Sequence, residues 1–287
     1  MRGRWLLFGV LLAWALAAAA HAADYRFSVP EADVTVRIQP DGSARIHYEL
    51  TFKCARGAHP IDVVDIGMPH MGQGHRPVSA AIDGRRIPQS SIRVSEMLTP
   101  RGCGYEVHLG SGTIQPGRSG VFEFTGIEDQ MVWQDTTNPE LASFRFSPTW
   151  FGQQFVDGTT KLTVHVVLPI PAEEFEAAKD DILWHKKGQD FTFKGVVEGE
   201  ELVSVGWTRD VSLTRAHMFG VSFPKKYVSH VRSDTVFSVF FRWFKGSREG
   251  QILSGAIVIV LFGIGFFRFT GQTGCALFVV LAAGLGG

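Results

Sequence analysis

Residues 34–53 read VTVRIQPDGSARIHYELTFK, and this stretch decides the class of fold. Apolar side chains occupy every second position on either side of Pro40-Asp41-Gly42. A period of two is typical of strands that bury one face. Proline and glycine favour a tight turn between the two halves, because proline restricts φ and glycine tolerates a positive φ. The stretch therefore predicts a β-hairpin.

Other segments show the same strand pattern. Residues 160–168 alternate strictly, and residues 171–181 are the one stretch with a helix pattern, with a proline and acids near its start. Many short strands and one short helix predict a mainly β fold. We expect an immunoglobulin-like β-sandwich, built either as one large domain or as two units over 23–130 and 131–232. Shorter strand candidates are 105–109, 121–124, 191–197, 202–207 and 219–223.

The composition argues against two classes of protein. The chain has 287 residues, with 28 basic and 28 acidic side chains and therefore no net formal charge. Hydrophobic residues make up 45%, which is enough for a packed core and argues against a disordered tail protein. A nucleic-acid-binding protein would carry a basic excess, so we expect no nucleic-acid partner.

The first 22 residues have the features of a secretory signal peptide. Arg2 and Arg4 precede an apolar run over 6–20, and residues 20–22 (AHA) match the small-x-small cleavage motif. Cleavage there leaves the rest of the chain outside the cytoplasm. We therefore expect the body of the protein in the periplasm or at the surface of a bacterium.

The far end of the sequence is strongly apolar. Residues 252–267 carry no charge, and roughly 20 apolar residues form a membrane-spanning helix, so we predict a transmembrane helix over 251–269. A second apolar segment over 274–287 is either re-entrant, giving a hairpin, or the start of a span that this sequence cuts short. The aromatic segment 233–250 predicts an interfacial element at the lipid surface, with a buried strand or helix as the alternative.

Cys54 and Cys103 are the two cysteines between the apolar ends. Cysteines outside the cytoplasm often pair, and a bridge closing this loop would contribute about 4 kcal/mol in the chain-entropy model. We predict a Cys54–Cys103 disulfide. The alternative is two separately buried thiols.

A short loop offers a candidate metal site. Met68, His70, Met71 and His75 lie within eight residues, and thioethers with imidazoles suit Cu(I). Histidine and aspartates within 59–65 would shift the preference toward Zn²⁺ or Cu(II). The alternative, which we favour, is a loop with solvated histidines and packed methionines, and no metal cofactor.

Aromatic residues offer a candidate binding surface. Trp133, Trp150 and Phe151 fall within one aromatic-rich stretch, and exposed tryptophan stacks on sugars or anchors a protein partner. The alternative, which we favour, is that these rings pack in the core of the sandwich.

No catalytic residues are predicted. The sequence has no Gly-x-Ser-x-Gly elbow, no HExxH motif and no phosphate-binding loop. The adjacent acids Glu128 and Asp129 lie in a loop-like stretch, where we interpret them as solvated charges rather than as acid–base groups. We therefore do not expect an enzyme.

Three segments carry a resemblance to a known family. Residues 27–52 (FSVPEADVTVRIQPDGSARIHYELTF), 205–207 (VGW) and 219–228 (FGVSFPKKYV) resemble bacterial predicted membrane proteins of the family called domain of unknown function 2207. The resemblance implies an extracytoplasmic β domain that opens with a hairpin and is followed by a membrane span. It covers the opening quarter of the chain and the approach to the membrane, and the sequence departs from the family pattern after Phe52. It implies no catalytic residues.

Together these patterns predict a membrane-anchored extracytoplasmic β protein that serves as a binding, assembly or sensor module of the cell envelope. The expected partners are membrane lipid and an envelope protein or polysaccharide. An alternative is a copper- or zinc-handling protein that uses the loop over 68–75. A hydrolase is the least favoured reading, because no motif supports it.

Overall fold

The computed structural model of the chain describes residues 24–68, 74–98, 104–184 and 190–233. The expected signal peptide over 1–22, the transmembrane helix over 251–269 and the segment 274–287 lie outside these ranges. None of the short helices in the described ranges has the length and apolarity that a membrane span requires. The described residues up to Arg232 form one unit.

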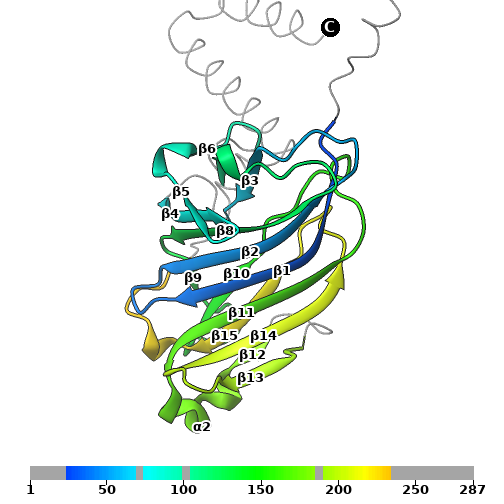
Figure 1. The fold of residues 1–287 in the computed structure, drawn as a ribbon. Coiled ribbons are helices and arrows are strands. Elements are labelled where there is room, and N and C mark those ends of the chain that lie inside the picture. Colours follow the sequence, from blue (N-terminus) through cyan, green and yellow to red (C-terminus); the bar gives the residue numbers. More distant parts are fainter. Residues whose placement is uncertain (1–23, 69–73, 99–103, 185–189, 234–287) are drawn as a thin grey trace, which may run out of the picture. The chain divides into compact units, whose positions relative to one another are not determined.

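The largest element is a sheet of eight strands in the order β13-β14-β11-β1-β2-β8-β4-β5 (Figure 1). Neighbouring strands are antiparallel except β1 and β11, which are parallel. Strands from both sides of residue 130 share this sheet, so the body is one large unit and not two separate sandwiches. The strands are β1 (Phe27–Ile38), β2 (Ala44–Cys54), β4 (His75–Ile82), β5 (Arg85–Ile87), β8 (Ser119–Glu128), β11 (Thr160–Pro171), β13 (Phe193–Val196) and β14 (Leu202–Val211).

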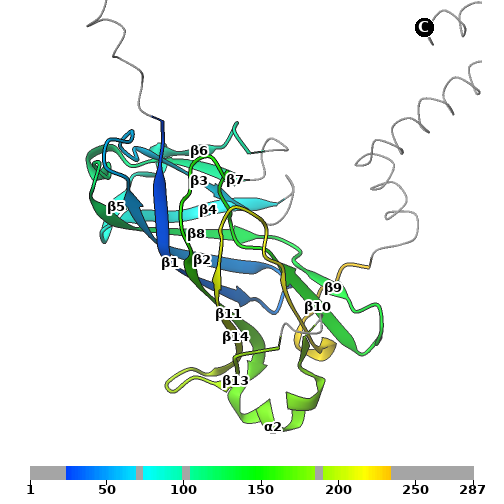
Figure 2. The ribbon, with the colours of Figure 1, turned by 90° about the vertical axis from the view of Figure 1, so that its right-hand side faces the viewer.

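Two smaller sheets complete the mainly β fold. A four-stranded sheet has the order β12-β15-β10-β9, and a three-stranded sheet has the order β3-β7-β6. Figure 2 shows β9 and β10 in a different part of the molecule from β3, β6 and β7. The strands are β3 (Val63–Gly67), β6 (Ile92–Val94), β7 (Gly104–His108), β9 (Val132–Gln134), β10 (Leu141–Phe146), β12 (Leu183–Trp184) and β15 (Phe219–Pro224).

Both smaller sheets cover the same face of the large sheet. Tyr48 of β2 and Phe124 of β8 are register partners, so their side chains lie on one face. The ring of Tyr48 lies 6.5 Å from that of Phe146 in the four-stranded sheet. The ring of Phe124 lies 5.8 Å from that of Tyr105 in the three-stranded sheet. The result is a sandwich of β layers, as the alternating sequence pattern predicts.

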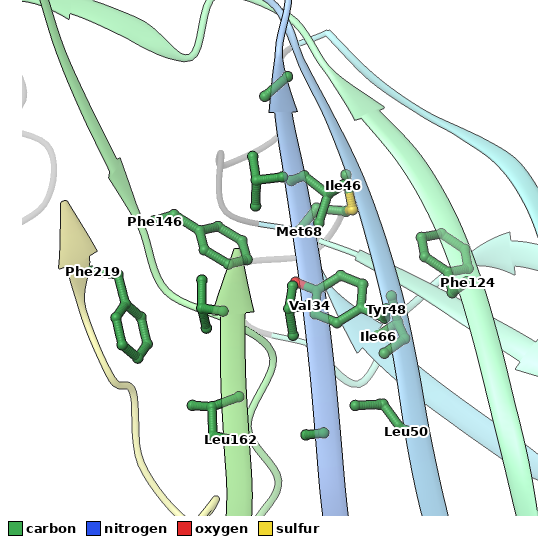
Figure 3. Packing of buried hydrophobic residues seen from close by; sticks show 14 of the residues in the cluster. Val34, Ile46, Tyr48, Leu50, Ile66, Met68, Phe124, Phe146, Leu162 and Phe219 are labelled. Atoms are coloured by element: carbon green, nitrogen blue, oxygen red, sulfur yellow. The ribbon is translucent and has the colours of Figure 1, made fainter. Parts of the chain in front are cut away.

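The core fills the space between these layers. Val34, Tyr48 and Leu162 come from three adjacent strands of the large sheet, and Phe146 and Phe219 face them from the four-stranded sheet (Figure 3). All five are buried. Burying such side chains is worth about 2 kcal/mol each, and this makes the inner face of the large sheet the main source of stability.

The hairpin predicted from residues 34–53 is confirmed. β1 and β2 pair in register from Ile38 opposite Ala44 outward. The Asp41 carboxylate accepts hydrogen bonds from the backbone N–H and the hydroxyl of Ser43, at 2.9 and 2.7 Å, which closes the turn. The turn also holds a segment far along the chain, because the backbone N–H of Ser229 donates to the carbonyl of Pro40 at 2.7 Å.

The helical segment predicted over 171–181 is present, but it is not one continuous α-helix. The segment consists of a 3-10 turn at Ala172–Glu174, a short α2 at Phe175–Ala178 and another 3-10 turn at Lys179–Asp181. Other 3-10 turns lie at Gln89–Ser91, Gly110–Gly112 and Lys225–Tyr227. The alternating sequence pattern does not predict β3, β4 or β10, which are short or irregular in sequence.

Replacing Gly42 by alanine tests the turn. Gly42 has a φ of +83°, and a Cβ there would overlap with the backbone oxygen of His230. We expect Gly42→Ala to lower the free energy of unfolding by roughly 3 kcal/mol, since backbone strain and a backbone clash add. The matched control is Gly57→Ala, because Gly57 has a φ of +75° with nothing within 4 Å of the added Cβ. Its loss should be about 1 kcal/mol, and equal losses in urea unfolding would refute the contact.

Candidate functional site

A buried carboxyl group marks the junction of the large sheet and the three-stranded sheet. Glu128 is the last residue of β8 and is fully buried, at 0% exposure. It faces the core because Phe124 and Gly126 precede it at alternate positions of the strand. Its register partners are Ala44 of β2 and His75 of β4. The interpretation of Glu128 as a solvated loop charge is therefore wrong, because β8 runs further than its apolar pattern indicates.

His75 is held in place from the three-stranded sheet. Its Nδ1 lies 2.7 Å from the hydroxyl oxygen of Tyr105, and the two rings meet edge to face at 5.1 Å. The Tyr105 hydroxyl also donates to the backbone oxygen of His75, at 3.1 Å. These contacts fix the imidazole beside the start of β4, opposite Glu128.

Tyr48 is the second tyrosine of this cluster. Its side chain is fully buried, and its hydroxyl donates to the carbonyl of Gly67 at 3.3 Å. The backbone N–H of Gly67 donates to the hydroxyl of Thr149 at 3.0 Å. The three-stranded sheet is thus tied to the large sheet through polar groups at the edge of the core.

Burial dominates the electrostatics of the cluster. Desolvation, with a smaller contribution from the Asp129 charge, raises the pKa of Glu128 from 4.5 to about 8. Desolvation and the Glu128 charge raise the pKa of Tyr105 to about 12. They also raise the pKa of Tyr48, where burial is again the larger cause. At neutral pH Glu128 is therefore largely in its protonated form, and it lies opposite His75.

The structure places two of the four predicted metal ligands at this cluster. Met68 is buried against β8, where a Cβ on Gly126 would lie 2.9 Å from the Met68 methyl carbon (Figure 3). His75 lies opposite Glu128, as described above. His70 and Met71 lie outside the described residues. Within the described ranges, no group of three or more His, Cys, Asp or Glu side chains has the geometry to hold a metal ion. The metal site stays a prediction.

The predicted disulfide is not formed. Cys54 is a buried free thiol, and its Sγ lies 3.4 Å from the backbone oxygen of His59, to which it can donate. Burial raises the pKa of this thiol. Cys103 lies outside the described residues.

The three predicted binding aromatics have different environments. Phe151 belongs to the core and meets Phe27 and Phe52 edge to face, at 5.3 and 5.6 Å. Trp133 is half-buried, with the guanidinium of Arg232 5.6 Å from its ring centre. Trp150 is 50% exposed. The interpretation as a core residue is thus confirmed for Phe151, whereas Trp150 lies at the surface.

Comparisons with known proteins give no family. No family model matches the chain, and no curated protein matches it. Among solved structures, an M1 zinc metallopeptidase from Deinococcus radiodurans is 16% identical with a TM-score of 0.41, over 71% of this chain and 43% of that one. Legionella pneumophila aminopeptidase A in complex with aspartic acid is 9% identical with a TM-score of 0.43, over 72% of this chain and 22% of that one. The chain thus spans less than half the length of these proteins, and similarity at this level supports no inference about activity.

Replacing Glu128 by glutamine tests whether the buried carboxyl group keeps its proton in the folded protein. The folded protein keeps the Glu128 proton up to a pH of about 8, whereas the unfolded chain releases it near 4.5. Its contribution to stability is therefore complete below pH 4.5 and is lost as the pH rises to 8. Glu128→Gln removes this dependence. We expect the free energy of unfolding of the variant minus that of the wild type to rise from near zero at pH 4 to roughly 3–4 kcal/mol at pH 8.

Urea unfolding at a series of pH values measures this difference. Glu198→Gln is the matched control, because it removes a carboxylate from an exposed position of the chain. The difference between this control and the wild type should change far less over the same range, because no buried group is altered. A flat profile for Glu128→Gln as well would show that Glu128 ionises normally in the folded state.

Proposed function

We propose that this chain is a membrane-anchored protein whose β-rich body lies outside the cytoplasm and binds another protein of the bacterial envelope. The sequence supports the location through the signal-like segment 1–22 and the apolar segment 251–269. The resemblance to the domain of unknown function 2207 family supports the same layout. In this proposal the body is immunoglobulin-like in having packed β layers, although its parallel β1–β11 pair sets its strand order apart from that of immunoglobulin domains.

The observation that carries the binding function is a group of exposed apolar side chains on two sheet edges. β12 is the edge strand of the four-stranded sheet, and β13 is the edge strand of the eight-stranded sheet. Leu183 and Trp184 of β12 are 43% and 44% exposed, and Val196 and Val197 are 36% and 41% exposed. Large apolar residues gathered at open edges are a feature of interaction surfaces. We call these four residues the edge patch.

Trp184 is supported from behind by a series of rings. Its ring lies 6.0 Å from Phe191, which lies 5.2 Å from Trp207, which lies 5.3 Å from Phe219. Trp207 and Phe219 belong to the core between the two sheets. A tryptophan held rigidly by the core loses little conformational entropy when a partner covers it, which is typical of an anchor residue in an interface.

An extended protein segment is the partner that suits this edge. β13 pairs with β14 on one side, and its other side is the end of the sheet (Figure 1). An added strand can hydrogen-bond to such an edge while its side chains contact the apolar residues beside it. A sugar that stacks on Trp184 would make no hydrogen bonds to the backbone of β13. A polysaccharide would therefore contact a smaller part of the edge patch than an extended protein segment would.

Photo-crosslinking in cells tests the partner. Trp184 is replaced by the photo-reactive amino acid p-benzoylphenylalanine in the full chain, and the exposed Trp150 serves as the matched position. We expect a discrete adduct with another envelope protein from position 184 only. Val196→Asp should remove most of that adduct, because a charge in the patch must be desolvated. An adduct with glycan strands would favour the polysaccharide reading, and equal adducts from both positions would refute the edge patch.

Protease digestion of spheroplasts tests the location independently. We expect the full chain in the membrane fraction after an alkaline carbonate wash, because a transmembrane helix resists extraction. Protease added outside the spheroplasts should degrade the body of the protein, while a cytoplasmic marker protein stays intact. A body protected until the membrane is dissolved would place it in the cytoplasm and would contradict the proposal.

A further inference from the structure

The face of the eight-stranded sheet that points away from the two smaller sheets carries its charges in rows. We call it the outer face. Asp33 of β1 is the register partner of Glu49 of β2, and Glu49 is the register partner of Glu123 of β8. These three carboxylates form an acidic row that crosses three adjacent strands. Neighbouring strands lie ~4.8 Å apart, so the carboxylates are close to one another.

A basic row runs parallel to the acidic row. Arg37 of β1 is the register partner of Arg45 of β2. The same row continues through Ile127 of β8 to Arg76 of β4. The basic row lies four residues along each strand from the acidic row, for example from Asp33 to Arg37.

An uncharged row separates the two. Thr35 of β1 pairs with His47 of β2, which pairs with Thr125 of β8. On the other side Thr35 pairs with His165 of β11. The row is tied together in part by a contact of 2.9 Å between Nδ1 of His47 and the hydroxyl of Thr125. The outer face therefore changes from acidic through neutral to basic along the strand direction.

This order does not stabilise the isolated sheet. Like charges directly opposite each other on neighbouring strands are destabilising. Glu31 and Lys161 show the favourable alternative, with a cross-strand ion pair of 3.3 Å. No ion pair or hydrogen bond within the described ranges involves the side chain of Asp33, Glu49 or Glu123. The acidic row is thus arranged to meet a positive partner outside its own chain.

The same face supplies that partner in the required arrangement. A two-fold axis along the uncharged row, across the strands, lays the acidic row of one copy over the basic row of the other. Asp33 then faces Arg37 of a second copy, and Glu49 faces its Arg45, with the same pairs repeated on the other side of the axis. An axis along the strands would instead place acid over acid. We infer that the outer face pairs with the outer face of a second copy of this chain, in a two-fold dimer with its axis along the uncharged row.

The pairs in this dimer are individually weak. Exposed ion pairs contribute roughly 0.2–1 kcal/mol each, and salt screens them. Arg37 also has an exposed ion pair of 3.3 Å with Glu200, and its guanidinium has enough donors to serve a second carboxylate. The dimer is therefore expected to be reversible and sensitive to ionic strength. It uses a sheet face and not the edge patch, so it does not depend on the envelope partner proposed above.

Cysteine cross-linking of the full chain tests the axis. Thr35 lies on the axis, so Thr35→Cys places two copies of the same cysteine opposite each other. A short bismaleimide is the suitable reagent, because face-to-face sheets lie ~10 Å apart and a disulfide would be too short. The matched control is Thr51→Cys on the same face of β2, four residues beyond His47 and hence far from its own copy.

We expect a cross-linked dimer from Thr35→Cys at low salt, several-fold less at 1 M NaCl, and only the wild-type background from Thr51→Cys. Equal yields from both variants, or none above background from Thr35→Cys, would overturn the inference.

Charge reversal tests the complementarity. In the Thr35→Cys background, Asp33→Arg with Glu49→Arg makes all four positions that pair in the dimer basic, and Arg37→Glu with Arg45→Glu makes all four acidic. Each variant alone should lose most of its cross-link, and an equal mixture should regain it as a mixed dimer. Recovery on mixing also shows that both variants fold. Cross-linking that survives either reversal, or that does not return in the mixture, would overturn the inference.

Discussion

The large sheet buries one of its two faces far more completely than the other, and the rest of the structure depends on this constraint. Val34, Tyr48 and Leu162 put an apolar surface on the inner side of three long neighbouring strands. No long helix is present in the described ranges to cover that surface, so two smaller sheets do so. The outer side is left to polar and charged residues, because strand side chains alternate.

The junction of the layers explains the unusual position of Glu128. The inner face continues to the end of β8, and the three-stranded sheet closes over it through Tyr105 and the segment around Gly67. A carboxyl group in that place must either keep its proton or remain a charge in an apolar environment. His75 on the adjacent strand lies opposite this carboxyl group. This combination is a better candidate for function than the solvated loop over 68–75 that the sequence indicates.

The open edges and the outer face offer two separate means of assembly. The edge patch combines apolar exposure with strands that end their sheets in the described part of the chain, which suits an extended protein segment. The outer face is polar and shows self-complementary rows of charge, which suit a second copy. The two surfaces can be covered at the same time, since the edge patch lies on the edge strands and the charged rows lie on the central strands of the large sheet.

The sequence by itself determined the long strands within residues 34–53 and 160–168, because a period of two is a local consequence of burying one side of a strand. It also determined the opening turn, through Pro40-Asp41-Gly42, and the place of the helical segment. Only the tertiary structure decided which strands are neighbours: the parallel pairing of β1 with β11 joins residues more than a hundred positions apart. For the same reason the sequence suggested a solvated Glu128, since burial arises from long-range packing and leaves no local pattern. The rows of charge on the outer face likewise follow from register, which each strand acquires only when its neighbours are in place.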